Sequence, residues 1–114
     1  MKIYNTLEPA YDVSGGDANF DSIPFEGKTF IGVQFFYTSI SQADATFRLQ
    51  ESLDGVNFID SQDSSGSDIE LTINNTISTD ILKAFDFNTG YIRIRYIEGT
   101  AATGTVNKIK FLFE

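Results

Sequence analysis

Apolar and polar residues alternate over several short segments of this chain, and no other feature of the sequence constrains the fold as strongly. Successive side chains of an extended strand point to opposite faces, so alternation with a period of two indicates strands with one buried face and one wet face. Gly, Asp, Asn and Ser separate the segments, as is typical of turns. No convincing helix pattern is present. The sequence therefore predicts an antiparallel sandwich or barrel.

The clearest predicted strand spans residues 29–38. Ile31, Val33 and Phe35 occupy one of its faces, and the opposite face is also partly apolar, so we expect a central strand. Residues 78–87 fit either a single helical turn or a short strand, and we favour the strand. Further strands are predicted at residues 45–52, 56–59, 68–73, 91–98 and 105–113.

Composition agrees with strands, since Ile, Val and Thr make up 28 of the 114 residues and Phe and Tyr add 16. The length is that of one domain, residues 1–114. Residues 1–25 contain both prolines and Gly15-Gly16, which predicts an edge strand and a long loop. We predict an all-β fold, a single antiparallel β-sandwich, jelly-roll-like or immunoglobulin-like, with seven or eight strands.

Twelve residues are predicted to form the core because they take the apolar positions of the alternating segments. They are Ile31, Val33, Phe35, Phe47, Leu49, Phe58, Ile69, Leu71, Ile92, Ile94, Ile109 and Phe111.

The last two predicted strands flank a short loop bounded by Gly99 and Gly104, so we expect them to pair as a hairpin. A symmetric loop places Ile94 opposite Ile109 and Ile92 opposite Phe111, which gives one apolar side.

The same register places Arg95 opposite Lys108 and Arg93 opposite Lys110. Like charges directly across a ladder are destabilising, so something should offset them. Three interpretations stay open: a solvated outer face, pairing with acidic residues such as Glu51, Asp68 or Glu70, or a contact with another molecule. These four cations are the candidate interface residues.

Charge is unevenly distributed along the chain. The whole chain has 8 basic and 16 acidic residues, a formal charge of −8. Residues 1–82 carry 3 basic and 13 acidic residues, whereas residues 83–114 carry 5 basic and 3 acidic ones. A strongly acidic chain is a poor general binder of nucleic acid, because affinity for phosphates depends on positive charge.

Cysteine and histidine are both absent, which removes disulfides, thiol catalysis, zinc sites and all imidazole chemistry. Glu26, Glu51, Glu70 and Glu98 could in principle supply a carboxylate pair for glycoside hydrolysis, but no spacing selects two of them. No serine nucleophile motif or glycine-rich phosphate loop is present. We expect no catalytic residue, no cofactor and no enzyme. No signal peptide or apolar run of membrane-spanning length is visible either, so we expect no membrane partner.

Two binding sites are weaker candidates. Asp60, Asp63 and Asp68 surround a serine-rich loop whose oxygens would suit calcium, but the loop lacks the EF-hand ligand pattern and is better interpreted as a solvated loop, so no metal is expected. Exposed tyrosines could stack on sugars, and the candidates are Tyr4, Tyr11 and Tyr37. Most phenylalanines occupy alternating positions and are interpreted as core.

Three segments together carry a family resemblance. They are Glu51-Ser52-Leu53-Asp54-Gly55-Val56-Asn57-Phe58, Gly90-Tyr91-Ile92-Arg93-Ile94-Arg95-Tyr96, and Gly99 through Gly104-Thr105-Val106-Asn107. In this order they resemble small β-sandwich modules of bacteriophage virion proteins, over residues 45–113. Phe58 stands where related modules commonly have Trp, and residues before 45 align with nothing.

The resemblance implies a non-enzymatic virion structural protein, an auxiliary or decorating capsid component that binds the capsid lattice or its own copies. The implied partners are the major capsid protein or other virion proteins, in a virion assembled in the host cytoplasm, with a homo-oligomer expected. The alternative is a carbohydrate-binding or adhesin module of a tail or head fibre.

Overall fold

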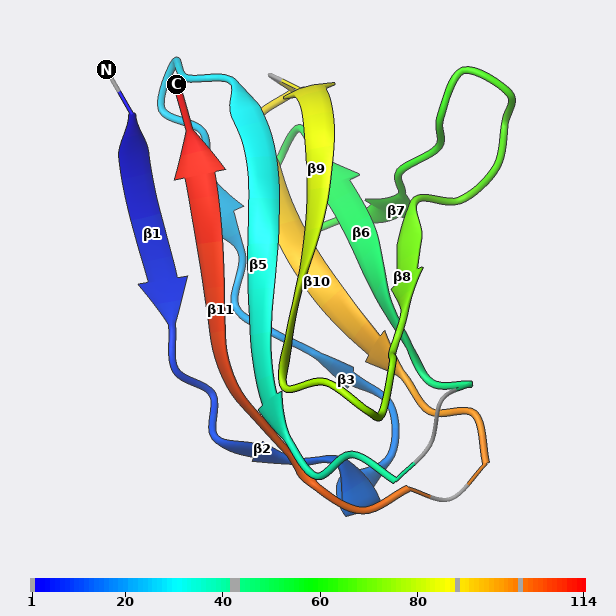
Figure 1. The fold of residues 1–114 in the computed structure, drawn as a ribbon. Helices are drawn as coiled ribbons and strands as arrows, with labels where there is room; N and C mark the ends of the chain where they lie inside the picture. The colour runs from blue at the N-terminus through cyan, green and yellow to red at the C-terminus, as the bar shows by residue number, and fades with distance from the viewer. Residues whose placement is uncertain (1, 42–43, 88, 101) are drawn as a thin grey trace.

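The computed structural model contains two antiparallel sheets packed face to face (Figure 1). It describes residues 2–41, 44–87, 89–100 and 102–114, and for residues 84–87 the backbone alone. The described residues form eleven strands and a single 3₁₀ turn, η1 (Val13–Gly15). The strands are β1 (Ile3–Leu7), β2 (Tyr11–Asp12), β3 (Ala18–Asn19), β4 (Ile23–Pro24), β5 (Phe30–Thr38), β6 (Thr46–Ser52), β7 (Ile59–Asp60), β8 (Glu70–Thr72), β9 (Thr79–Phe87), β10 (Tyr91–Ile97) and β11 (Thr105–Phe113).

The strand order is that of a jelly roll. Sheet A has the order β1-β11-β5-β9, with β2 on the same edge of β11 as β1. Sheet B has the order β3-β10-β6-β7, where β4 shares one edge with β3 and β8 shares the other with β7. The short strands therefore share positions, and the eleven strands fill four positions in each sheet. From β9 onward the long strands alternate between the sheets, which is the double-sheet arrangement of jelly rolls.

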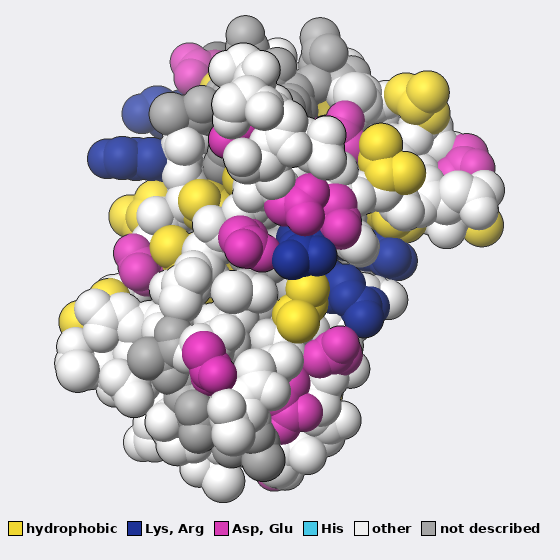
Figure 2. Space-filling model, turned by 90° about the vertical axis from the view of Figure 1, so that its right-hand side faces the viewer, with side chains coloured by type: hydrophobic (Ala, Val, Ile, Leu, Met, Phe, Trp, Pro, Cys, Tyr) yellow, Lys and Arg dark blue, Asp and Glu magenta, His cyan; other side chains and the backbone are white. Residues whose placement is uncertain are grey.

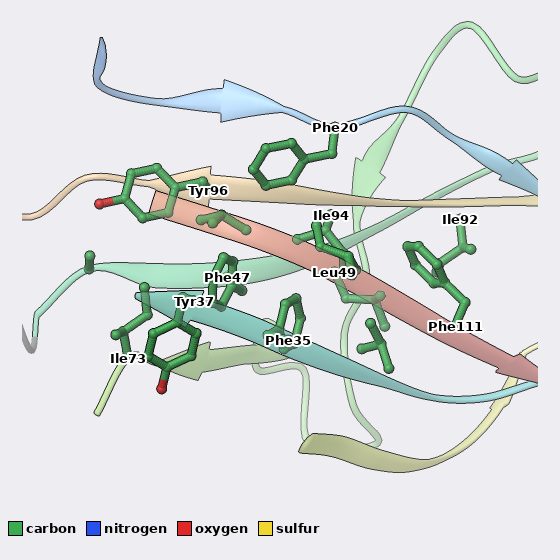
Figure 3. Packing of buried hydrophobic residues seen from close by; sticks show 14 of the residues in the cluster. Phe20, Phe35, Tyr37, Phe47, Leu49, Ile73, Ile92, Ile94, Tyr96 and Phe111 are labelled. Carbon is green, nitrogen blue, oxygen red and sulfur yellow. The ribbon is translucent and has the colours of Figure 1, made fainter. Parts of the chain in front are cut away.

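The core lies between the sheets and is rich in aromatic rings (Figure 3). Phe35 of sheet A and Phe47 of sheet B stack with centroids 4.1 Å apart and an interplanar angle of 5°. Eight of the twelve predicted core residues are buried, namely Val33, Phe35, Phe47, Leu49, Ile92, Ile94, Ile109 and Phe111. The alternating pattern thus located most of the core, and the prediction of an all-β sandwich is confirmed.

The predicted C-terminal hairpin is wrong. β10 pairs with β3, β4 and β6, whereas β11 pairs with β1, β2 and β5, so the two segments lie in different sheets. Ile94 does not pair with Ile109, nor Ile92 with Phe111, although all four side chains are buried. Alternation requires only that apolar side chains face inward, and strands facing each other across a core satisfy it as well as a hairpin does.

Ile31 is a second correction, because it is only half-buried and lies outside the core. The pairing of β5 with β11 shifts here, because the consecutive residues Leu112 and Phe113 pair with Gly32 and Phe30, so β5 contains one extra residue, a β-bulge at Ile31. A bulge adds one residue and reverses the alternation at that point. Phe30 and Val33 are therefore both buried, and Ile31 lines the outer face of the sheet.

Three other predicted core residues, Phe58, Ile69 and Leu71, are half-buried at the periphery. Ile69 and Leu71 still pack against the core. The predicted return strand at 56–59 is also too early, since β7 pairs with β6 only at residues 59 and 60. Residues 79–87 form a nine-residue strand, so the preference for a strand over a helical turn at this place is confirmed.

Candidate functional site

The outer face of sheet A carries two rows of side chains that cross all four strands. The first row follows the pairs Tyr4↔Leu112, Leu112↔Gly32 and Gly32↔Lys83. The second row runs through Thr6, Lys110, Gln34 and Ile81 in the same way. The rows mix apolar side chains with two lysines, an unusual composition for the solvated face of a sandwich strand.

Gly32 makes this face concave, because it stands in the first row without a side chain between Leu112 and Lys83. The result is a groove of about 580 Å³, within the size range of ligand-binding clefts. Its lining residues are Tyr4, Ile31, Gly32, Val33, Gln34, Ile81, Lys83, Lys110 and Leu112. We call this surface the sheet A groove. Tyr4 and Ile81 are about half exposed there, at 55% and 51%.

The charge of the groove is opposite in sign to that of the whole chain. Lys83 and Lys110 line it, and no carboxylate does so among the described residues. The ammonium group of Lys110 lies 4.8 Å from the centroid of the Tyr4 ring, and that of Lys108 lies 5.5 Å from the Phe36 ring. Within the part of the chain that the structure describes, no salt bridge engages these lysines. Their charges are available to an external anion.

Arg93 and Arg95, the two arginines among the four candidate interface residues, lie on β10 in sheet B. Both contact other side chains of the same molecule. The guanidinium carbon of Arg93 lies 4.1 Å above the Phe58 ring, and its Nε donates a 2.8 Å hydrogen bond to Gln50. Burial, with a smaller contribution from Arg95, lowers the pKa of Arg93. Arg95 pairs with Asp17 at 3.4 Å and donates to Asn19. The predicted set of four cations is therefore split, two on each face of the sandwich.

Like charges do meet across a ladder, but between Arg48 and Arg95 rather than between the arginines and lysines. Arg48 contacts Asp60 at 3.3 Å, Asp68 at 3.8 Å and Glu70 at 2.9 Å. Hydrogen bonding to Glu70 raises the pKa of Arg48. Figure 2 shows basic side chains surrounded by acidic ones near the middle of its view. Two carboxylates of the calcium interpretation, Asp60 and Asp68, thus face a guanidinium group.

The third calcium candidate, Asp63, organises its own loop by accepting hydrogen bonds from Ser65 and Ser67, which lowers its pKa. The four glutamates of the hydrolase interpretation lie on separate elements. Glu70 contacts Arg48, Glu98 accepts from the Ala102 amide, and Glu26 and Glu51 lie after β4 and on β6. The described residues contain no cluster of three metal-ligating side chains.

Among the three tyrosines considered for sugar stacking, the structure exposes Tyr4. Tyr37 is buried and donates to the Asn74 carbonyl, and burial raises its pKa. Tyr11 is half-buried, and its hydroxyl donates to the Gly16 carbonyl. Tyr4 therefore combines an accessible ring with a place in the sheet A groove.

Sequence reasoning found Lys110 and Tyr4 but missed Gly32, Ile81 and Lys83. The groove depends on pairing between strands that are far apart in the chain. The predicted C-terminal hairpin gave β11 a different neighbour, so that pairing was not predicted. One signal was present: Gly32 interrupts the longest apolar segment, and a glycine inside a strand often marks a bulge or a concave place.

Comparison with protein-family models, curated proteins and solved structures gives no match to this chain. No helix in the described part of the chain has the length and apolar character required to cross a membrane.

Proposed function

We propose that this protein is a non-enzymatic binding module that attaches to other proteins through the sheet A groove. The observation that carries the proposal is the composition of the groove, which has an apolar floor and two lysines. Neither lysine forms an ion pair within the described structure, although the whole chain has a charge of −8. Such a surface fits an apolar segment with acidic neighbours. The resemblance over residues 45–113 supports a virion setting, with the major capsid protein, other virion proteins or copies of this chain as partners.

The test measures mass and cosedimentation of the purified protein, alone and mixed with bacteriophage particles. Wild type should bind in a saturable and salt-sensitive manner. A Lys83→Glu/Lys110→Glu variant should bind at least about tenfold more weakly, because two attractive charges become repulsive. The matched control is Lys2→Glu/Lys28→Glu, which makes the same charge change outside the groove. Equal binding by both double variants would reject the groove, and absence of particle binding would reject the virion setting.

A carbohydrate-binding or adhesin module is the second candidate, and the exposure of Tyr4 favours it. The Tyr4 ring and the Gln34 amide border the same groove and offer a stacking surface and a hydrogen-bonding group. A glycan array decides: reproducible binding that Tyr4→Ala removes supports this candidate, and an empty array excludes it.

A further inference from the structure

The most exposed large apolar side chains of the described chain belong to one turn. Leu53, Val56 and Ile59 are 80%, 77% and 68% exposed. They follow β6 and extend to the start of β7, and we call residues 53–59 the apolar turn. Single exposed apolar side chains are ordinary, whereas three within seven residues indicate a contact surface. Figure 2 shows hydrophobic side chains projecting both at the upper right and at the left of the molecule.

Hydrogen bonds among residues 52–57 hold the apolar turn in one shape. The Asp54 carboxylate accepts 2.8 Å hydrogen bonds from the amides of Val56 and Asn57, from the Asn57 side chain and from the Ser52 hydroxyl. Gly55 has φ +76°, and a Cβ there would lie 3.0 Å from the Tyr91 ring. A fixed turn loses little conformational entropy when it binds.

The apolar turn lies on the opposite side of the sandwich from the sheet A groove. Gly55 lies against Tyr91 and Phe58 lies under Arg93, and both Tyr91 and Arg93 are outward-facing positions of β10 in sheet B. One molecule therefore cannot place its own turn in its own groove. A second copy can place its turn in that groove, and the pair then has one free groove and one free turn, on different copies, at its two ends.

The two surfaces are complementary in charge, and both are partly apolar. A hollow of about 390 Å³ beside the turn is lined by Glu51 and Asp54 together with Leu53 and Ile59, so the turn presents apolar side chains next to carboxylates. The groove presents an apolar floor next to Lys83 and Lys110. Chains of charge −8 repel in most orientations, and this orientation brings opposite charges together.

We propose that the apolar turn of one copy binds in the sheet A groove of the next copy, in a head-to-tail contact. Such a heterologous contact repeats and gives rings or open chains rather than closed two-fold dimers. The inference deepens the proposed function, on which it rests, because it names one occupant of the same groove.

The experiment uses two variants of the full chain that each lose one half of the contact. The groove variant is Lys83→Glu/Lys110→Glu, and the turn variant is Leu53→Gln/Val56→Gln. Ile77→Gln is a single-substitution control for the turn variant, because Ile77 is exposed but lies on neither surface. Circular dichroism and urea unfolding verify that each variant folds like wild type.

Sedimentation velocity at low salt over a range of concentrations gives the readout. Wild type and Ile77→Gln should form growing assemblies, and each double variant alone should associate at least about tenfold more weakly. An equimolar mixture of the two variants should form 1:1 dimers and no larger species, because one intact groove and one intact turn remain. A monomeric wild type, or a mixture that stays monomeric, would overturn the proposal, as would a double variant that assembles normally.

Particle binding separates this inference from the proposed function. The turn variant keeps an intact groove, so it should still bind bacteriophage particles. If wild type is monomeric while particle binding depends on Lys83 and Lys110, the head-to-tail contact is rejected and the proposed function stands. If the variants complement each other but no particle is bound, the contact stands and the virion setting is rejected.

Discussion

The rings of Phe35 and Phe47 lie nearly parallel, 4.1 Å apart, and this pair joins sheet A to sheet B at the centre of the core. Phe47 also contacts the rings of Tyr37 and Tyr96, with centroids 6.1 and 6.0 Å away. Truncation of the Phe47 side chain would leave a cavity between the two sheets. Close-packed interiors relax only partly around such a cavity.

Phe47→Ala should therefore lower the free energy of unfolding by about 3–5 kcal/mol, as measured by urea denaturation. Phe36→Ala is the control, since Phe36 is half-buried on the outer face of β5, and it should cost about 1 kcal/mol. Losses of equal size would contradict the placement of Phe47 in the core.

Gly104 permits the chain to cross from β10 in sheet B to β11 in sheet A. It has φ +122°, and a Cβ would lie 2.7 Å from the Ser39 carbonyl oxygen and 2.8 Å from the Ile40 backbone. Gly104→Ala should cost at least about 2 kcal/mol of unfolding free energy. Gly66→Ala should cost only about 1 kcal/mol, because Gly66 also has a positive φ, +84°, but an added Cβ there would meet nothing within 4 Å. Thermal melts of both variants check the ranking.

The same crossing shows where sequence reasoning succeeds and where it stops. The alternation at Ile92, Ile94, Ile109 and Phe111 correctly predicts that these side chains point inward. It carries no information about which strand lies beside which, because a seven-residue link from residue 98 to 104 can close a hairpin or span the roughly 10 Å between packed sheets. Ala102, buried within that link, is evidence for the crossing.

The sheet A groove escaped sequence reasoning for a related reason. Lys110, Gln34 and Ile81 become neighbours only through the order β11-β5-β9. The bulge of β5 opposite β11 then moves Ile31 to the outer face, a local reversal that a strict period of two cannot predict.

Tyr96 holds a buried hydroxyl that has no hydrogen-bond partner among the described residues. Tyr96→Phe removes this oxygen and should raise the free energy of unfolding by about 1 kcal/mol. Burial, with smaller contributions from Glu98 and Tyr11, raises the pKa of Tyr96 to about 12. The unfolded chain ionises this phenol near its ordinary pKa of about 10, so stability should be lost as the pH rises from there toward 12. Phenolate absorbance should show an ionisation near pH 12 that Tyr96→Phe removes.

Ionisation of the Asp54 carboxylate makes the stability of the folded protein depend on pH in the acidic range. Hydrogen bonds from the backbone amides of Asn57 and Val56 lower the pKa of Asp54 below its ordinary value. The ionised form therefore stabilises the folded state above the unfolded pKa of about 4, and this contribution is lost as the pH falls further. Asp54→Asn should make the unfolding free energy less dependent on pH in that acidic range. A slope identical to that of wild type would contradict this role of Asp54.

Arg48 neutralises three carboxylates at once, so its removal should leave Asp60, Asp68 and Glu70 repelling one another. Each contact is partly exposed, so a single ion pair here would contribute little to stability. One cation that contacts three carboxylates forms a network and contributes more. Arg48→Gln should cost about 1 kcal/mol or more of unfolding free energy at low ionic strength, and the loss should shrink as salt screens the repulsion. Arg95→Gln is the control, because Arg95 contacts a single carboxylate, that of Asp17, within the described structure, and its effect should be smaller. A salt-independent loss for Arg48→Gln would show that packing of the Arg48 side chain rather than charge holds β7 and β8 against β6. A larger loss for Arg95→Gln would contradict the role of Arg48 as a cation shared by three carboxylates.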